Sequence, residues 1–363
     1  MNIQELQSKT VDWLRFPLIV GVVFIHTKYF APEAVPLADI NYANLSTEDI
    51  GVIISSIFSI FIPCVAVPLF FMISGYFFFY KLNMWNKSVY LDKIKSRIKT
   101  LVIPYLLWNT IALAGIIYLN YNIPNETIIE KNNSLFFYIR GYIIHTGFTP
   151  YLQPMWFIRD LIILSIGSPI LYFLIKKMNY YIIFVFLLIY ILFYILSINP
   201  IFMIFGPSLF YFSLGAFLSI NNLNMIEEAR KIKSICEMIC VISLFLFLYL
   251  KGNGYWKYIT PFYIISGIIV TLKIVSYLYE NQKIRLNPFL SKASFFVFAV
   301  HELFLLNSWK TIFIKLNEPL TALSGITGYF VVPILTIFSA LIIFYLLQRY
   351  FPKITSILTG SRS

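Results

Sequence analysis

Charged residues are scarce in this sequence. Asp, Glu, Lys and Arg together make up 12% of the 363 residues, whereas soluble globular proteins carry about 25%. Hydrophobic residues reach 59% and aromatic residues 19%. These proportions exclude an ordinary soluble domain, and they indicate a polytopic membrane protein with a lipid bilayer around it.

Cysteine and histidine are also few, with three residues of each. Cys64, Cys236 and Cys240 lie in or beside apolar runs and show no metal-ligand spacing. We therefore expect buried free thiols and no bound metal. The N-terminus lacks a basic segment followed by a small-residue cleavage site, so we expect no signal peptide.

Apolar runs of membrane-spanning length recur along the chain. They fall near residues 14–30, 52–80, 101–119, 156–175, 179–197, 200–220, 235–250, 258–279, 291–312 and 323–348. We predict an all-α fold in which residues 1–363 form a single membrane domain of about ten transmembrane helices. The longest connection, residues 120–155, is predicted to be extracytoplasmic and to hold an interfacial or re-entrant segment.

Basic residues outnumber acidic ones by 28 to 16, which gives a formal net charge of +12. In a soluble protein this excess would suggest nucleic acid, but membrane proteins concentrate Lys and Arg in their cytoplasmic loops. With ten helices both termini share one side, and nineteen basic residues fall on that side against seven on the other. We therefore predict cytoplasmic termini and no nucleic-acid partner.

The first apolar run contains ionisable groups, which are costly in hydrocarbon and mark a functional site by default. Asp12 and Arg15 lie at its start, and His26 follows Arg15 by eleven residues. Eleven helical steps return to the same face after a rise of about 16 Å. One helix face would therefore hold an anion near one membrane surface and present an imidazole deep inside.

Later segments carry further ionisable residues. Arg159 and Asp160 open the run at 156–175; adjacent residues do not face each other on a helix, so we expect each to pair with another group. An interface anchor is the alternative for Arg159. His301 and Glu302 lie inside the ninth run, where structural pairing and catalysis both remain open. We expect His145 to be an interface residue.

The order of these blocks resembles the acyltransferase-3 family of membrane acyltransferases, in its stand-alone bacterial O-acetyltransferase form. The matching blocks are Asp12-x-x-Arg15 with His26, Val67 to Tyr76, Arg97 with Pro104-Tyr105 and Trp108, Trp156-Phe157 with Arg159-Asp160-Leu161, Phe210 to Ala216, and Phe298 to His301. The resemblance implies a ten-helix bundle in the inner (cytoplasmic) membrane. It implies transfer of an acyl group, usually acetyl, from cytoplasmic acyl-CoA to a hydroxyl of a cell-envelope glycan or lipid-linked sugar.

Acetyl-CoA is thus the expected donor, and its phosphates need a cationic anchor. Arg15, Arg97 and Lys99 lie near one predicted helix mouth and are candidates for phosphate contacts. The resemblance adds Tyr105 to this cofactor site. Asp12 is expected to orient Arg15, its i,i+3 neighbour.

The acceptor hydroxyl needs a base, and His26 is the candidate, because imidazole titrates near neutral pH. Ser74, Tyr76 and Arg159 are candidate donors for the oxyanion of the tetrahedral intermediate. The rival interpretations are a secondary transporter or channel and a non-enzymatic envelope polysaccharide-assembly protein. The sequence leaves the acceptor, the acyl chain length and the oligomeric state open.

Overall fold

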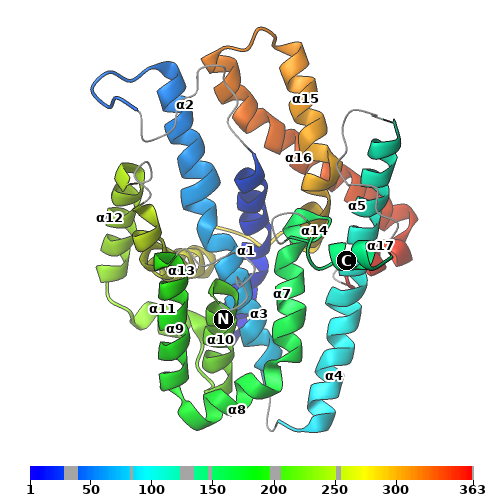
Figure 1. The fold of residues 1–363 in the computed structure, drawn as a ribbon. Helices are drawn as coiled ribbons and strands as arrows, with labels where there is room; N and C mark the ends of the chain where they lie inside the picture. Colours follow the sequence, from blue (N-terminus) through cyan, green and yellow to red (C-terminus); the bar gives the residue numbers. More distant parts are fainter. Residues whose placement is uncertain are drawn as a thin grey trace.

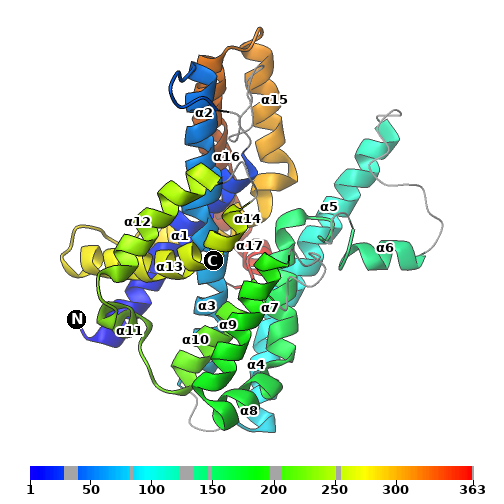
Figure 2. The ribbon, with the colours of Figure 1, turned by 60° about the vertical axis from the view of Figure 1, so that its left-hand side comes forward.

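The computed structural model describes residues 1–27, 40–81, 85–122, 135–145, 149–196, 206–250 and 255–361. Within them the chain forms α-helices, short 3₁₀ segments and π-helical turns, and no β-strand. The predicted all-α fold class is therefore confirmed. Figures 1 and 2 show an elongated helical assembly with the first helix, α1 (Ile3–His26), among the central elements.

The first half of the chain contains α2 (Thr47–Ser56), η2 (Ile57–Phe61), η3 (Ile62–Val65), α3 (Ala66–Phe79), α4 (Lys87–Arg97), η4 (Ile98–Val102), α5 (Ile103–Asn122), α6 (Leu135–Gly141), η5 (Gln153–Met155), α7 (Trp156–Ile166) and α8 (Ser168–Met178). The second half contains α9 (Tyr180–Ile195), α10 (Pro207–Ile220), α11 (Met225–Lys231), α12 (Ile235–Leu250), α13 (Trp256–Glu280), α14 (Pro288–Val300), η8 (His301–Leu305), α15 (Leu306–Leu316), α16 (Ala322–Tyr350) and α17 (Pro352–Leu358). Of the η segments, η2, η4 and η8 are π-helical.

Among the described residues, five helical stretches are long and apolar enough to cross a membrane: Thr47–Phe79, Lys87–Leu119, Trp256–Glu280, Pro288–Leu316 and Ala322–Tyr350. Two bent pairs, α7 with α8 and α10 with α11, raise the number to seven if each pair is one span. The chain is thus a multi-pass membrane protein. The ten predicted segments all coincide with helices where they are described, but ten crossings stay a prediction.

Two predicted boundaries are wrong. The first helix begins at Ile3 rather than near residue 14, because the Asn2 side chain caps it by accepting a hydrogen bond from the Glu5 amide at 2.8 Å. The predicted helix at 156–175 is bent by 63° between α7 and α8. Pro169 lies in the first turn of α8, where its missing N–H prevents a regular continuation of α7.

Helices α3 and α10 pack backbone to backbone through two glycines. A Cβ atom on Gly75 would lie 2.0 Å from the Phe212 carbonyl oxygen, and one on Gly215 would lie 1.9 Å from the Met72 carbonyl oxygen. Only glycine allows this approach, and small residues allow such contacts between membrane helices in general. The pair fixes α3, which forms one wall of the site described below.

The chain connections gather at two ends of the molecule. The end of α3, the start of α4 and the α8–α9 junction lie together at the lower end of Figure 1. The start of α2, the end of α15 and the start of α16 lie at the upper end. The lower group includes the basic residues Lys81, Lys87, Lys176 and Lys177.

The predicted loop at 120–155 is described only in part, because residues 123–134 and 146–148 lie outside the described ranges. Its helix α6 and the turn after it pack beside α5. The Tyr142 hydroxyl lies 2.8 Å from Thr110 Oγ1, and the Tyr105 hydroxyl donates to the Tyr142 carbonyl. The position of this loop relative to a membrane stays a prediction.

Candidate active site

One end of the candidate site is the arginine in the first half of α1. Asp12 Oδ1 lies 3.3 Å from an Nη atom of Arg15, and the two side chains are 33% and 44% exposed. A guanidinium has five N–H donors, so this contact leaves most of them available. The Arg15 side chain is thus oriented by its neighbour and still able to bind an anion.

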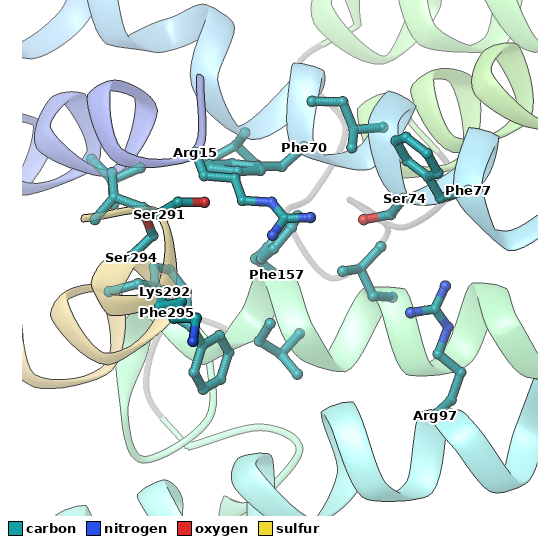
Figure 3. Close-up of a pocket in the computed structure, with 17 residues that line it drawn as sticks. Arg15, Phe70, Ser74, Phe77, Arg97, Phe157, Ser291, Lys292, Ser294 and Phe295 are labelled. Carbon is teal, nitrogen blue, oxygen red and sulfur yellow. The ribbon is translucent and has the colours of Figure 1, made fainter. Parts of the chain in front are cut away.

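A cavity of ≈ 230 Å³ lies between α1, α3, α4, α7 and α14, and three cations line it. Figure 3 shows the Arg15 guanidinium directed toward Ser74, with Lys292 on one side of it and Arg97 on the other. The rest of the lining is mainly apolar: Ile19, Val22, Val67, Phe70, Ile73, Phe77, Phe157, Ile158, Leu161, Phe295 and Phe298, with Ser291 and Ser294 as further polar members. The cavity therefore suits a ligand with an anionic head and an extended, largely neutral arm.

The second end of the site is the last turn of α1. His26 lies one turn beyond Val22, which lines the cavity, and the same helix face carries both. On α14, the carbonyl of Phe298, which also lines the cavity, is 2.8 Å from His301 Nδ1. Two of the helices that line the cavity, α1 and α14, thus also carry a group of ionisable side chains one turn beyond it.

His26 and Glu302 form a pair at this end. The distance from His26 Nδ1 to Glu302 Oε1 is 3.3 Å, and their side chains are 18% and 22% exposed. A carboxylate accepts hydrogen bonds, so this contact favours the tautomer of His26 with its proton on Nδ1. The lone pair of a neutral His26 is then on Nε2, which is the arrangement a general base requires.

His301 completes the group. Its ring centroid lies 5.2 Å from that of His26, and its side chain is fully buried. His301 and Glu302 both belong to the π-helical turn η8, and such turns occur frequently at functional sites. One donor atom each from His26, His301 and Glu302 lie within 4.8 Å of one another. Imidazole and carboxylate are ligands that zinc accepts, so within the described part of the chain these three residues form a group that could hold a metal.

Ser74 and Tyr76 lie far from His26. Gly21 packs against Pro63, and the Tyr76 hydroxyl is within hydrogen-bonding reach of the Gln7 side chain, so α1 and α3 run antiparallel. Ser74 therefore lies beside the first half of α1, roughly 20 Å along the helix axis from the level of His26. This placement does not suit the oxyanion role expected of Ser74 and Tyr76, but it puts Ser74 next to Arg15.

Arg159 belongs to a different network. Its Nη2 atom lies 3.0 Å from Asp160 Oδ1, and its Nη1 atom donates to the Ile143 carbonyl at 2.8 Å. The buried Asp160 also accepts from the Ser208 hydroxyl at 3.0 Å. Each residue thus pairs with another group, as expected, but the long arginine side chain also folds back to its neighbour Asp160. Arg159 ties α7 to the turn after α6 and is absent from the cavity lining among the described residues.

The remaining two predicted cofactor residues also lie outside the cavity lining. The Tyr105 hydroxyl is committed to the Tyr142 carbonyl. Lys99 is exposed in the π-helical turn η4. Of the four residues predicted to bind the cofactor, the structure brings Arg15 and Arg97 together around one cavity.

Lys292 lines the cavity, but the sequence does not predict it as a site residue. Its neighbours in the sequence are those of an ordinary lysine at a helix end, so the sequence indicates a role in topology only. Its position on the first turns of α14, beside Ser291 and Ser294, is what directs it to the cavity.

Comparisons with known proteins indicate the family of this chain. The model of the acyltransferase domain family matches residues 9–352. The Succinoglycan biosynthesis protein ExoH of Rhizobium meliloti (strain 1021) is 25% identical over 380 residues, which cover 98% of this chain and 93% of that protein. No solved structure matches the chain. The family match extends over nearly the whole chain and includes both ends of the candidate site, so this protein belongs to the acyltransferase-3 family.

Proposed function

We propose that this protein is a membrane-bound O-acyltransferase that moves an acetyl group from cytoplasmic acetyl-CoA to a hydroxyl of a cell-envelope polysaccharide or its lipid-linked precursor. One observation carries the proposal. A cavity lined by Arg15, Arg97 and Lys292 ends one helical turn from an imidazole that is paired with a carboxylate: Val22 lines the cavity, and His26 follows it by four residues. These are the two requirements of acyl transfer from CoA: an anchor for phosphates and a base for the acceptor.

The donor occupies the cavity. CoA carries a pyrophosphate and a ribose phosphate, and guanidinium groups bind phosphate oxygens in pairs while an ammonium acts as a point charge. Arg15 and Arg97 therefore supply the directed contacts and Lys292 adds charge. The pantetheine arm follows the apolar wall of the cavity past Val22 and Phe298, and the thioester reaches His26.

The acceptor reacts at His26. Its Nε2 atom takes the proton of the acceptor hydroxyl while the hydroxyl oxygen attacks the thioester carbonyl carbon. The tetrahedral intermediate then collapses, the carbon–sulfur bond breaks, and CoA leaves as the thiolate. Glu302 holds Nδ1–H throughout and stabilises the imidazolium that forms. This pairing supplies the partner that fixes the tautomer of His26.

Two further observations support the acceptor class and the membrane orientation. The relative from Rhizobium meliloti is named for the biosynthesis of succinoglycan, which favours a polysaccharide acceptor here. We place both termini in the cytoplasm, together with the connections that lie at the lower end of Figure 1. Ten helices then cross the inner membrane. The basic residues of that end support this orientation.

The test uses the purified protein in lipid nanodiscs with radiolabelled acetyl-CoA and an envelope glycan fraction as acceptor. Wild type should transfer label, and His26→Ala should lose about 10²- to 10⁴-fold in rate. The matched control is His145→Ala, because His145 contacts the Tyr151 ring away from the His26–Glu302 pair. Binding of acetyl-CoA with no transfer would refute an enzyme. Transport of an unmodified glycan would favour the secondary-transporter or assembly alternative.

A further inference from the structure

The last turn of α1 is held by a single serine hydroxyl. Ser59 Oγ lies 2.6 Å from the Phe24 carbonyl oxygen and 3.0 Å from the Thr27 carbonyl oxygen. It also lies 2.6 Å from the Tyr329 hydroxyl of α16. The Ser59 and Tyr329 side chains are both buried. His26 lies between the two carbonyls that this hydroxyl contacts.

The direction of these hydrogen bonds follows from chemistry. The two carbonyls can only accept, so Ser59 donates its one proton to them. The Tyr329 hydroxyl then donates to Ser59 Oγ at 2.6 Å, which is nearer than its other acceptor, the Ser55 carbonyl at 3.4 Å. The result is an ordered chain from Tyr329 through Ser59 to the backbone of α1. The Phe24 carbonyl also accepts from the Thr27 amide at 3.1 Å, so Ser59 gives it a second donor and joins it to the Thr27 carbonyl just beyond the helix.

The elements that carry the chain are themselves well fixed. Ser59 lies in the π-helical turn η2, and Tyr329 lies within α16. The Phe24 ring packs against the rings of Tyr329 and Phe330, with centroid distances of 5.7 and 6.1 Å. Helix α16 also packs against η8, which carries Glu302. The same helix thus contacts the elements that hold both partners of the His26–Glu302 pair.

We propose that Ser59 and Tyr329 are positioning residues that set the height and rotation of His26 against Glu302. They touch neither substrate, and they act through the carbonyls on either side of the base. The inference rests on the proposed function, in which His26 must meet both the thioester and the acceptor. Displacing a catalytic group by about 1 Å can cost about 10²-fold in rate.

The test compares Ser59→Ala, Tyr329→Phe and the double variant in nanodiscs. Each single variant should lower kcat by about 10- to 100-fold and leave the KM for acetyl-CoA unchanged. Because the two hydroxyls act in series, the double variant should be no slower than Ser59→Ala. Ser59→Thr keeps the hydroxyl and should restore kcat. Unchanged kcat in Ser59→Ala, or additive losses in the double variant, would overturn the proposal.

Two matched controls separate positioning from general stability. Tyr263→Phe removes a buried hydroxyl that donates to the Phe61 carbonyl of the same turn η2 at 2.9 Å, rather than to the Ser59 hydroxyl. Thr336→Val removes a buried hydroxyl of α16 that bonds within its own helix. Both should lower the melting temperature as much as the test variants do, with kcat unchanged. If a control variant lowered kcat as much as Tyr329→Phe does, the loss of activity would reflect lower stability rather than the position of His26.

A second readout does not depend on activity. Amide hydrogen exchange of residues 24–27 and carbethoxylation of His26, followed by mass spectrometry, should increase in Ser59→Ala and Tyr329→Phe and not in the controls. If wild type transfers no acetyl group, the proposed function fails, while these measurements still decide whether Ser59 and Tyr329 position His26. No increase in either measurement would refute the positioning role.

Discussion

The pairing of His26 with Glu302 makes a quantitative prediction for Glu302→Gln. The substitution keeps the size of the side chain and removes the charge that faces His26 Nδ1 at 3.3 Å. A glutamine amide can also donate to Nδ1, which would move the imidazole proton to Nε2 and remove the basic lone pair. The variant should therefore slow the chemical step and leave acetyl-CoA binding intact, because Glu302 is not part of the cavity lining.

The magnitude follows from the geometry. Unit charges 3.3 Å apart interact by about 5 kcal/mol at an effective dielectric constant of about 20, which is a ceiling. Both side chains keep some exposure, so a hydrogen bond to a charged group, worth about 1.5–3 kcal/mol, is the better guide. Since 1.36 kcal/mol is tenfold in rate, kcat should fall about 10- to 150-fold.

The assay is the release of CoA from acetyl-CoA in the presence of the envelope glycan fraction, measured as kcat and KM. Glu237→Gln is the matched control, because Glu237 also pairs with a cation between apolar helices, Lys273 at 2.6 Å, away from His26. The double variant of His26→Ala with Glu302→Gln should be no slower than His26→Ala. Wild-type kcat in Glu302→Gln, or a further large loss in the double variant, would refute the pairing.

Three further predictions concern binding and stability. Arg15→Ala and Lys292→Ala should each weaken acetyl-CoA binding in equilibrium titrations. The loss should be about 10-fold for Arg15 and smaller for Lys292, because the Lys292 side chain is exposed. An unchanged Kd would show that the substituted residue is not part of the phosphate site. Arg159→Ala leaves the buried Asp160 carboxylate without its cation and should cost about 3–5 kcal/mol of stability. The folded yield measured by size-exclusion chromatography should therefore drop. A normal yield with a lost kcat would instead support an oxyanion role for Arg159. Gly215→Ala drives a Cβ into a backbone carbonyl of α3 and should destabilise by about 1–3 kcal/mol, read as a lower melting temperature.

Local properties of the chain were predictable from the sequence. Apolar runs identified the helices because hydropathy and length act within one segment. The Asp12–Arg15 contact followed from i,i+3 spacing on a single helix. The bend between α7 and α8 had a signal in Ser168-Pro169 that the apolar run obscured.

Contacts between distant segments were not predictable. The carboxylate opposite His26 comes from Glu302, and periodicity within α1 carries no information about which helix packs beside it. Arg159 shows the opposite limit: its sequence position suggested a site role, but packing placed it in a network with Asp160 and Ser208. The donor cavity likewise depends on α14 lying against α1, which brings Lys292 to Arg15.

The π-helical turns have a consequence for how this family can vary. A π-helical turn contains one residue more than a regular helix of the same path, so deleting a single residue from η8 would restore an ordinary helix. Because the π-helical turn absorbs the extra residue, the flanking helices would keep their relative rotation, and the side chains within the turn would change direction. The hydropathy profile would hardly change, yet Glu302 and His26 would no longer share a side. The insertion or deletion of one residue within these helices would therefore change function, although an alignment based on hydrophobicity alone would not register it.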